Sequence, residues 1–305
     1  MSAGDKTHAN LGLFFQRGYY EDLTAEILTD STKDKKNQTK YFDDRNSELK
    51  ESSKRVILKE SAISDTLSFK LRTVYPGLVT GIGMAHATGM EGEGKLGMIF
   101  DYTTGLPYIP GSSVKGLLRS MFPILPPNKP LNKVDEKTKE LLPRKRQIIC
   151  RLWNEKVIKH EEILKEWHEL KESQPDIPSM QIEEHEIDEL AKIIFEGQLK
   201  DSYLSIYDRD IFFDAQISNY DKEKGILDFD YITPHKETLK NPTPIKFLKI
   251  LPSVTFVFEF KLHNNKLKSG KVILANAKKL LFQEILTTVG IGAKTNVGYG
   301  QLKSV

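Results

Sequence analysis

Cysteine and tryptophan are scarce in this 305-residue chain, which has one cysteine, Cys150, and two tryptophans. A single cysteine excludes an internal disulfide framework and argues against a cysteine-based zinc site, which fits a reducing compartment. No apolar run approaches the ~20 residues that a membrane-spanning helix needs. The first fifteen residues also lack the pattern of a signal peptide, so we expect a cytoplasmic protein with no membrane partner.

The residues that are present favour a folded chain. Hydrophobic residues make up 39% and charged residues 29%, enough for a packed core, and the length fits about two domains or one fold with a large insertion. The net charge of +3 is unevenly spread. Residues 238–305 hold eleven lysines, no arginine and two acids, a net charge of +9, against −6 for residues 1–237. This basic end suggests either a surface that faces a polyanion or a lysine-rich face that confers solubility.

The hydrophobic pattern predicts an α+β fold. Alternating residues predict strands at 66–81, 203–217 and 253–262, and helical spacing predicts helices at about 112–122 and 270–290, before a short last strand. This order matches a ferredoxin-like (RRM-like) β-α-β-β-α-β plan. We assign residues 1–62 to an N-terminal helical and irregular extension and 63–305 to the core domain. Within that domain, 128–200 is an insertion of two or three helices.

The stretch "LPYIPGSSVKGLLRSMF" begins the first core helix. Ser112 or Ser113 is the expected N-cap, and Lys115 and Arg119 share one helix face four residues apart. Cations near a helix N-terminus oppose its dipole, so their placement is better explained if an anion such as phosphate binds there. The alternative is an ordinary capped helix with solvated cations.

A second glycine-rich stretch, "GIGAKTNVGYG", spans Gly290–Gly300. It fits neither a dinucleotide-binding fingerprint nor a Walker loop, because the glycine spacing and the element order differ. Glycines let a backbone approach a ligand closely, Lys294 adds charge, and Tyr299 offers a ring for stacking. The loop would suit a phosphodiester backbone or a base. The alternative is a structural loop whose glycines only adopt positive φ.

Catalytic patterns are weak. Asp208, Asp210 and Asp214 would share a face if extended and could bind Mg²⁺, but solvated or ion-paired carboxylates are the more common outcome, and we predict no metal site. The seven histidines include His86, in a glycine-rich loop, and His235. An RNA-processing enzyme could use such a histidine as general acid or base. No serine–histidine–aspartate pattern is evident, and we predict no catalytic residues.

The two glycine-rich motifs carry a family resemblance. "TGLPYIPGSSVKGLLR" and "VGIGAKTNVGYGQL" resemble the two signatures of the RAMP (repeat-associated mysterious protein) superfamily of CRISPR–Cas systems. "DIFFDAQI", "YITPH" and "PTPIKFLKI" resemble its Cmr branch, type III-B. Together with "NLGLFF", they are most similar to the sixth subunit of that branch. The resemblance runs from about Asn10 to the end, except for the helical insertion and the charged stretch after residue 28.

The resemblance implies a ferredoxin-like core that binds CRISPR RNA (crRNA) inside a multi-subunit effector. Its partners would be the other Cmr subunits and complementary target RNA, and the sixth subunit caps the filament near the 3′ end of the guide. No cofactor is implied. The motif matches place these residues at the guide backbone: Ser112, Ser113, Lys115, Arg119, Gly290, Gly292, Lys294, Thr295, Asn296 and Tyr299.

The resemblance also implies a thumb-like element that contacts the guide–target duplex. Our candidate is the loop Met84–Gly97, including His86 and Met90. In this family, target cleavage belongs to an aspartate of the repeated backbone subunit. The loop holds Glu91 and Glu93 but no aspartate, so the resemblance does not carry cleavage to this chain.

Three functions remain open at this point. The first is a non-catalytic, guide-RNA-binding structural subunit of a type III-B RNA-targeting effector. The second is a metal-independent RAMP endoribonuclease that processes precursor CRISPR RNA, with His86 as its candidate residue. The third is a scaffold that touches only proteins.

Overall fold

A computed structural model describes residues 10–24, 27, 32–59, 63–81, 88, 90, 92–94, 98–124, 134–199, 202–233 and 244–305. The predictions that concern His86 and His235 lie outside these ranges. No helix among the described residues is long and apolar enough to cross a membrane.

The centre of the molecule is an antiparallel sheet built around β1 (Leu67–Thr73) and β8 (Thr255–Lys261). The short β11 (Leu302–Ser304) pairs with the outer edge of β1. The outer edge of β8 pairs first with β4 (Ile211–Phe212) and then with β5 (Gln216–Asn219). The spatial order is therefore β11–β1–β8–β4, with β5 beside β4 along β8.

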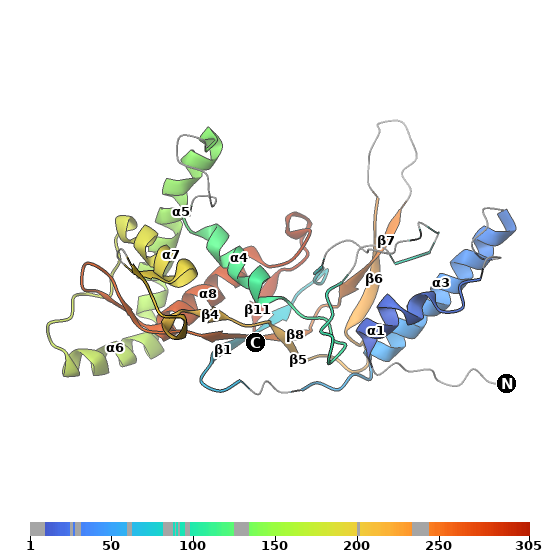
Figure 1. Cartoon of the computed structure of the whole chain (residues 1–305), viewed down its shortest axis with the longest axis horizontal. Coiled ribbons are helices and arrows are strands. Elements are labelled where there is room, and N and C mark those ends of the chain that lie inside the picture. The colour runs from blue at the N-terminus through green and yellow to red at the C-terminus, as the bar shows by residue number, and fades with distance from the viewer. Residues whose placement is uncertain are drawn as a thin grey trace.

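Two helices, α4 (Gly111–Met121) and α8 (Ala275–Val289), pack side by side on one face of this sheet (Figure 1). The chain order is β1, α4, β4 and β5, β8, α8 and β11. Combined with the strand order, this is the ferredoxin-like arrangement. The predicted α+β, ferredoxin-like fold class is confirmed.

Aromatic side chains fill the layer between sheet and helices. Phe256, Phe258 and Phe260 alternate along β8 and are buried, as strand geometry requires of one face. Phe69 of β1 stacks on Phe258 at 5.6 Å, and Phe282 of α8 contacts Phe260 at 5.4 Å. Full burial of each such ring is worth about 1.5–3 kcal/mol, so this layer is the main source of cohesion between sheet and helices.

A buried ion pair joins α8 to the edge of the sheet. Lys278 of α8 and Asp210, just before β4, are almost completely buried, with Nζ and Oδ2 2.6 Å apart. The backbone carbonyl of His263 and the side chain of Asn265 accept the other protons of the ammonium group. Burial lowers the pKa of Lys278, and the carboxylate of Asp210 opposes that shift. Removing one member of such a pair costs about 3–5 kcal/mol.

The region between α4 and β4 is helical. It contains α5 (Glu136–Glu155), η3 (Val157–Lys159), α6 (Glu161–Ser173), η4 (Glu184–Glu186) and α7 (Ile187–Glu196), followed by β2 (Gln198–Leu199), β3 (Ser202–Tyr203) and η5 (Ile206–Asp208). Its described part forms three α-helices, at the upper end of the two or three expected. Salt bridges Lys156–Glu284 and Lys279–Glu162 fix these helices to α8.

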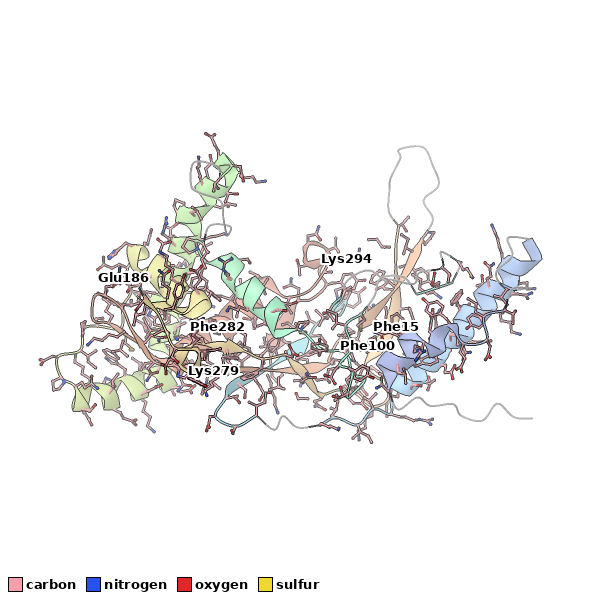
Figure 2. The ribbon with its side chains drawn as sticks, viewed as in Figure 1. Phe15, Phe100, Glu186, Lys279, Phe282 and Lys294 are labelled. Carbon is pink, nitrogen blue, oxygen red and sulfur yellow. The ribbon has the colours of Figure 1, made fainter. Side chains whose placement is uncertain are left out.

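The N-terminal helices pack against a separate hairpin. Helices α1 (Leu11–Gln16), η1 (Gly18–Tyr20) and α3 (Thr32–Ser53) surround a core that includes Phe15 and Phe100, whose rings lie 5.7 Å apart (Figure 2). The hairpin of β6 (Leu227–Ile232) and β7 (Ile245–Ile250) contacts α3 and rises away from the central sheet (Figure 1). The remaining elements are β9 (Asn265–Lys266), β10 (Val272–Ile273) and η6 (Thr295–Val297).

Three predicted elements were wrong in extent. The strand expected over residues 66–81 ends at Thr73, before a turn at residues 75–76. The single strand expected over residues 203–217 is broken into β3, η5, β4 and β5, and Ser205 caps η5 by accepting the amide proton of Tyr207. The helix expected from residue 270 begins only at Ala275, because Val272 and Ile273 pair with β9. The serine cap of η5 interrupts the predicted strand, and the pairing of Val272 and Ile273 with β9 delays the start of the predicted helix.

Candidate functional site

The start of α4 differs from the prediction. The N-cap is Pro110, and neither Ser112 nor Ser113 caps the helix, so that prediction was wrong. Asp214 takes the role, since its Oδ1 accepts the amide proton of Gly111 at 2.7 Å. A carboxylate from between β4 and β5 therefore already stabilises the positive end of the helix dipole. Both serines lie exposed in the first turn.

The two cations of α4 make contacts within the chain. Lys115 is half-buried, with Nζ 5.5 Å from the centre of the Phe212 ring, and burial and the nearby Arg119 lower the pKa of Lys115. Arg119 forms a 3.3 Å salt bridge with Glu196 of α7. Between them, Gly116 is exposed, and a Cβ atom there would meet nothing within 4 Å. The middle of this helix face is therefore open to close approach by another molecule.

The glycine-rich loop after α8 is held by backbone hydrogen bonds. Ile291 donates to Gly300 at 2.9 Å, Ala293 donates to Val79 at 2.8 Å, and Gly300 donates to Gly77 at 2.8 Å. Gly290, Gly292 and Gly300 have positive φ. A Cβ on Gly290 would come 2.6 Å from the carbonyl oxygen of Gly300. These glycines thus permit a tight backbone crossing that other residues could not adopt.

Tyr299 anchors this loop from below. Its side chain is 9% exposed, its ring lies 5.7 Å from that of Phe247, and its hydroxyl donates to Asp230 Oδ2 at 2.6 Å. The ring is therefore unavailable for base stacking in this conformation, and the interpretation of Tyr299 as an exposed stacking face was wrong. Sequence alone could not show that the β6–β7 hairpin supplies Phe247 and Asp230 beneath the loop.

Asp230 also binds a lysine. Its Oδ2 lies 2.7 Å from Nζ of Lys249 on β7. Burial would raise the pKa of Asp230, but hydrogen bonds from Lys249 and Tyr299 outweigh burial and hold that pKa below its ordinary value. The same carboxylate, together with burial, raises the pKa of Tyr299. This buried network ties the glycine loop to the hairpin.

The outer surface of the loop is polar and basic. Lys294 sits with Nζ 5.5 Å from the centre of the Phe247 ring (Figure 2), and it has no ion pair among the described residues. Thr295, Asn296 and Val297 form η6, with Asn296 and Val297 exposed. The neighbouring turn displays Tyr75, which is 83% exposed. Gly298 faces Pro76, the next residue in that turn. Sequence reasoning missed Tyr75, although a tyrosine before a Pro-Gly turn is a usable signal for exposure.

Half of the described lysines in the lysine-rich end of the chain pair with acids of the same chain. Lys246, Lys249, Lys271, Lys278 and Lys279 pair respectively with Asp43, Asp230, Glu186, Asp210 and Glu162. Each of these acids lies in the acidic first 237 residues. The charge asymmetry therefore serves contacts between the two parts of the chain, and it leaves fewer lysines, Lys294 and Lys303 among them, without a carboxylate partner in the described ranges.

The described part of the thumb-like loop packs against the N-terminal helices at Glu93 and Gly94, whereas Thr88 is exposed. Met90 is half-buried against the hydrophobic core, and Glu93 is 1% exposed and accepts the hydroxyl proton of Tyr20 at 2.9 Å. Gly94 donates its amide proton to the hydroxyl of Tyr19. These contacts fix this part of the loop to the N-terminal helices.

The three aspartates of "YDRDIFFDAQ" do different work. Asp210 pairs with Lys278, Asp214 caps α4, and Asp208 lies in the first turn of η5. Within the described ranges, no group of three or more histidine, cysteine or acidic side chains is arranged to hold a metal ion.

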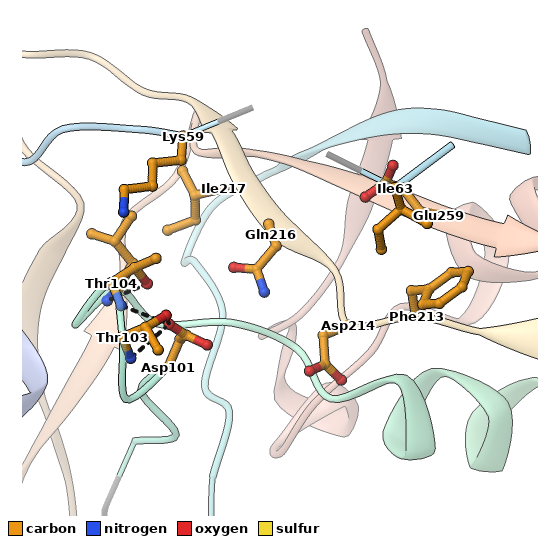
Figure 3. A pocket seen from close by; sticks show the side chains of 11 residues that line it. Lys59, Ile63, Asp101, Thr103, Thr104, Phe213, Asp214, Gln216, Ile217 and Glu259 are labelled. Carbon is orange, nitrogen blue, oxygen red and sulfur yellow. Dashed lines mark hydrogen bonds between the residues drawn. The ribbon is translucent and has the colours of Figure 1, made fainter. Parts of the chain in front are cut away.

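A cavity of about 300 Å³ lies on the sheet side of the α4 start (Figure 3). Its charged lining is mostly acidic, with Asp101, Asp214 and Glu259 against Lys59. Burial would raise the pKa of Asp101, but hydrogen bonds from Thr103 and Thr104 outweigh it and lower that pKa. Such a lining repels phosphate, so the cavity is not a candidate for nucleic acid.

Comparison with protein-family models establishes the family of this chain. A model of the RAMP superfamily matches residues 70–303, about three quarters of the chain. This range includes α4 and the glycine loop. The chain belongs to the RAMP superfamily. No curated protein sequence matches it significantly.

Several solved structures are also similar to this RAMP protein. The type III-B Cmr-beta complex bound to cognate target RNA contains a chain with 17% identity, TM-score 0.47, and coverage of 90% of this chain and 75% of that chain. Cmr6 from Pyrococcus furiosus has 22% identity, TM-score 0.39, and coverage of 79% and 98%. A type III-A Csm–crRNA–target RNA complex gives 16% identity, TM-score 0.24, and coverage of 56% and 40%.

Proposed function

We propose that this RAMP protein is a non-catalytic structural subunit of a type III-B CRISPR effector complex. It binds guide RNA and caps the filament near the 3′ end of the guide, where it contacts the guide–target duplex, as the sixth Cmr subunit does. Its partners are CRISPR RNA, complementary target RNA and other Cmr subunits. The observation that carries the proposal is the family match across both glycine-rich motifs, combined with an unpaired Lys294 on the exposed side of the second.

The geometry supports contact with an RNA backbone. The glycine loop is a rigid platform, since hydrogen bonds to residues 77–79 and the Asp230 network hold it from below. It carries the half-buried Lys294 and Thr295 and the exposed Asn296, a charge with two hydrogen-bonding side chains that suits a phosphodiester. Tyr75 supplies the exposed ring that Tyr299 does not. Base stacking on one ring tolerates any base, which suits a guide of variable sequence.

Helix α4 offers an exposed surface that another molecule could approach closely. Gly116 leaves the outer face of α4 without a side chain, and Ser112 and Ser113 expose hydroxyl groups one turn earlier. An exposed glycine in a helix interior costs about 0.5–1 kcal/mol relative to alanine, and no contact with a described residue explains the glycine at position 116. Close approach of an RNA strand or a neighbouring subunit would explain why this position is a glycine.

An assay of precursor RNA separates this function from the endoribonuclease. Purified protein mixed with repeat-containing RNA should bind without cutting it, with or without divalent metal. Cleavage by the wild-type chain that His86→Ala abolishes would replace the proposal with the processing enzyme. Cleavage that survives in His86→Ala would point to a contaminating nuclease, which a second purification removes.

A further inference from the structure

The face of the central sheet opposite α4 and α8 carries a row of polar side chains. Along β1, Phe69, Leu71 and Thr73 point into the core, so Lys70 and Arg72 point to the other face. Lys70 and Lys303 are exposed, so this face is open to solvent along β1 and β11, whereas Thr255 of β8 on the same face is buried.

The strand register places four of these side chains side by side. Arg72 lies directly opposite Lys303 on β11 and opposite Thr255 on β8, and Thr255 lies opposite Asn219 on β5. The row Lys303–Arg72–Thr255–Asn219 thus crosses the whole sheet. It contains two cations and no acid.

Without a bound anion, the row Lys303–Arg72–Thr255–Asn219 destabilises the sheet. Like charges directly opposite each other on paired strands destabilise a sheet, and neither Arg72 nor Lys303 forms a salt bridge among the described residues. Nε of Arg72 and Oγ1 of Thr255 are also buried without a hydrogen-bond partner. Thr255 is 2% exposed. A buried polar atom left unpaired costs about 1–3 kcal/mol, and here two such atoms are cross-strand neighbours.

We propose that this row is a second anion-binding site, which takes a phosphodiester group of a single-stranded RNA on the open face of the sheet. A phosphate lying on the exposed surface of β1 and β11 would neutralise Arg72 and Lys303 and would accept hydrogen bonds from the guanidinium. The middle of this face presents Val257 and Gln216 in place of an aromatic ring. The contact is therefore to the backbone and independent of sequence, unlike RRM domains, whose sheet aromatics stack on bases. The inference rests on the proposed RNA-binding function but concerns the opposite face of the sheet.

Lysine footprinting of the wild-type full-length chain tests this site directly. The protein is acetylated at low ionic strength with and without a single-stranded RNA, and the reactivity of each lysine is read by mass spectrometry. We expect RNA to protect Lys70 and Lys303 as well as Lys294, while exposed Lys165 on α6 stays reactive. Inorganic phosphate at the same phosphate concentration should protect none of them.

Each other outcome overturns the assignment in a distinguishable way. Protection of Lys294 without Lys70 and Lys303 would leave the proposed function standing and remove the second site. Equal protection by inorganic phosphate would make the row a free-anion site. No protection of any lysine would overturn both the second site and the proposed function.

A salt titration gives a second, independent measurement. Lys303→Gln changes only an exposed side chain, so it should fold normally and reduce the slope of log K against log salt by about one. Lys165→Gln is the matched control and should leave the slope unchanged. An unchanged slope in Lys303→Gln, with a reduced slope in Lys294→Gln, would contradict the second site.

Discussion

At the scale of single residues, burial separates the side chains that build the glycine loop from those that can meet a ligand. Tyr299 lies beneath the loop and Lys294 lies on it, although they are only five positions apart in the chain. Sequence placed both in one RNA-contacting motif, Lys294 for its charge and Tyr299 for its ring. It could not show that only Lys294 is placed to meet a ligand, because the contacts that bury Tyr299 come from the β6–β7 hairpin, where Asp230 lies 69 positions earlier.

Lys294→Gln should weaken RNA binding without changing stability. The substitution removes one half-buried positive charge that has no carboxylate partner among the described residues, so we expect the salt slope of RNA binding to fall by about one and the thermal midpoint to change little. Fluorescence anisotropy across a salt series measures the slope. Lys165→Gln, on α6, is the control for general loss of charge, and an equal effect of both variants would contradict a specific role for Lys294.

Tyr75→Ala should weaken RNA binding through lost stacking. The ring is exposed, so its removal should change the free energy of unfolding by no more than about 0.5 kcal/mol. Loss of one base–ring stack should reduce binding free energy by about 1–3 kcal/mol. Tyr75→Phe is the matched variant and should bind like the wild type. Normal binding by Tyr75→Ala would show that no base stacks at this turn.

Tyr299→Phe should destabilise the fold in a pH-dependent way. The pKa of Asp230 is below its ordinary value, so its contribution to stability is present above the unfolded pKa, about 3.9, and is lost as pH falls through the folded pKa. Without the tyrosine hydroxyl, that folded pKa rises. We expect a loss of about 1–2 kcal/mol at pH 7, at the lower end for a charged hydrogen bond because the Asp230 side chain is one-third exposed.

Urea unfolding of both proteins at a series of pH values measures this effect. The difference between wild type and Tyr299→Phe should shrink steadily below pH ~4, where Asp230 becomes protonated in both. A difference that is constant down to pH 2 would mean that the hydroxyl acts through packing and that the Asp230 network contributes little.

At the scale of elements, sequence periodicity identified the strands and helices that bury a full apolar face. The alternation in β1 and β8 and the helical stripe of α4 are examples, because each buries several large side chains against the core. It failed where a side-chain hydrogen bond from elsewhere decides the boundary. Asp214, which caps α4 from 103 positions away, is such a case.

Gly116→Ala separates stability from binding on α4. The alanine methyl group meets nothing within 4 Å, so the substitution should stabilise the helix by about 0.5–1 kcal/mol. If RNA or a neighbouring subunit approaches this face closely, the same methyl group should weaken that association. Thermal unfolding of the free protein and co-purification with the complex measure the two effects. A stabilised variant that assembles normally would show that nothing contacts Gly116.

At the scale of the whole molecule, half of the described lysines in residues 238–305 form ion pairs with acids of the same chain. Lysines of the C-terminal part pair with acids of the N-terminal part and of the helical insertion, which joins segments far apart in sequence. Composition correctly indicated a basic end but could not show which cations remain unpaired. That distinction requires the three-dimensional contacts, as does the row across the open face, which exists only in the register of four strands.

The most direct test of the central claim is a pull-down of the tagged full-length chain from its native host, with sequencing of the co-purified RNA and mass spectrometry of the co-purified proteins. The proposed function predicts short CRISPR RNAs that share a repeat-derived 5′ end, together with several other RAMP subunits. It also predicts that the complex recovered with Lys294→Gln releases this RNA at lower salt. The same RNAs without companion proteins would favour a processing enzyme, and recovery of companions without RNA would favour a protein-only scaffold. Either result would contradict a guide-binding structural subunit.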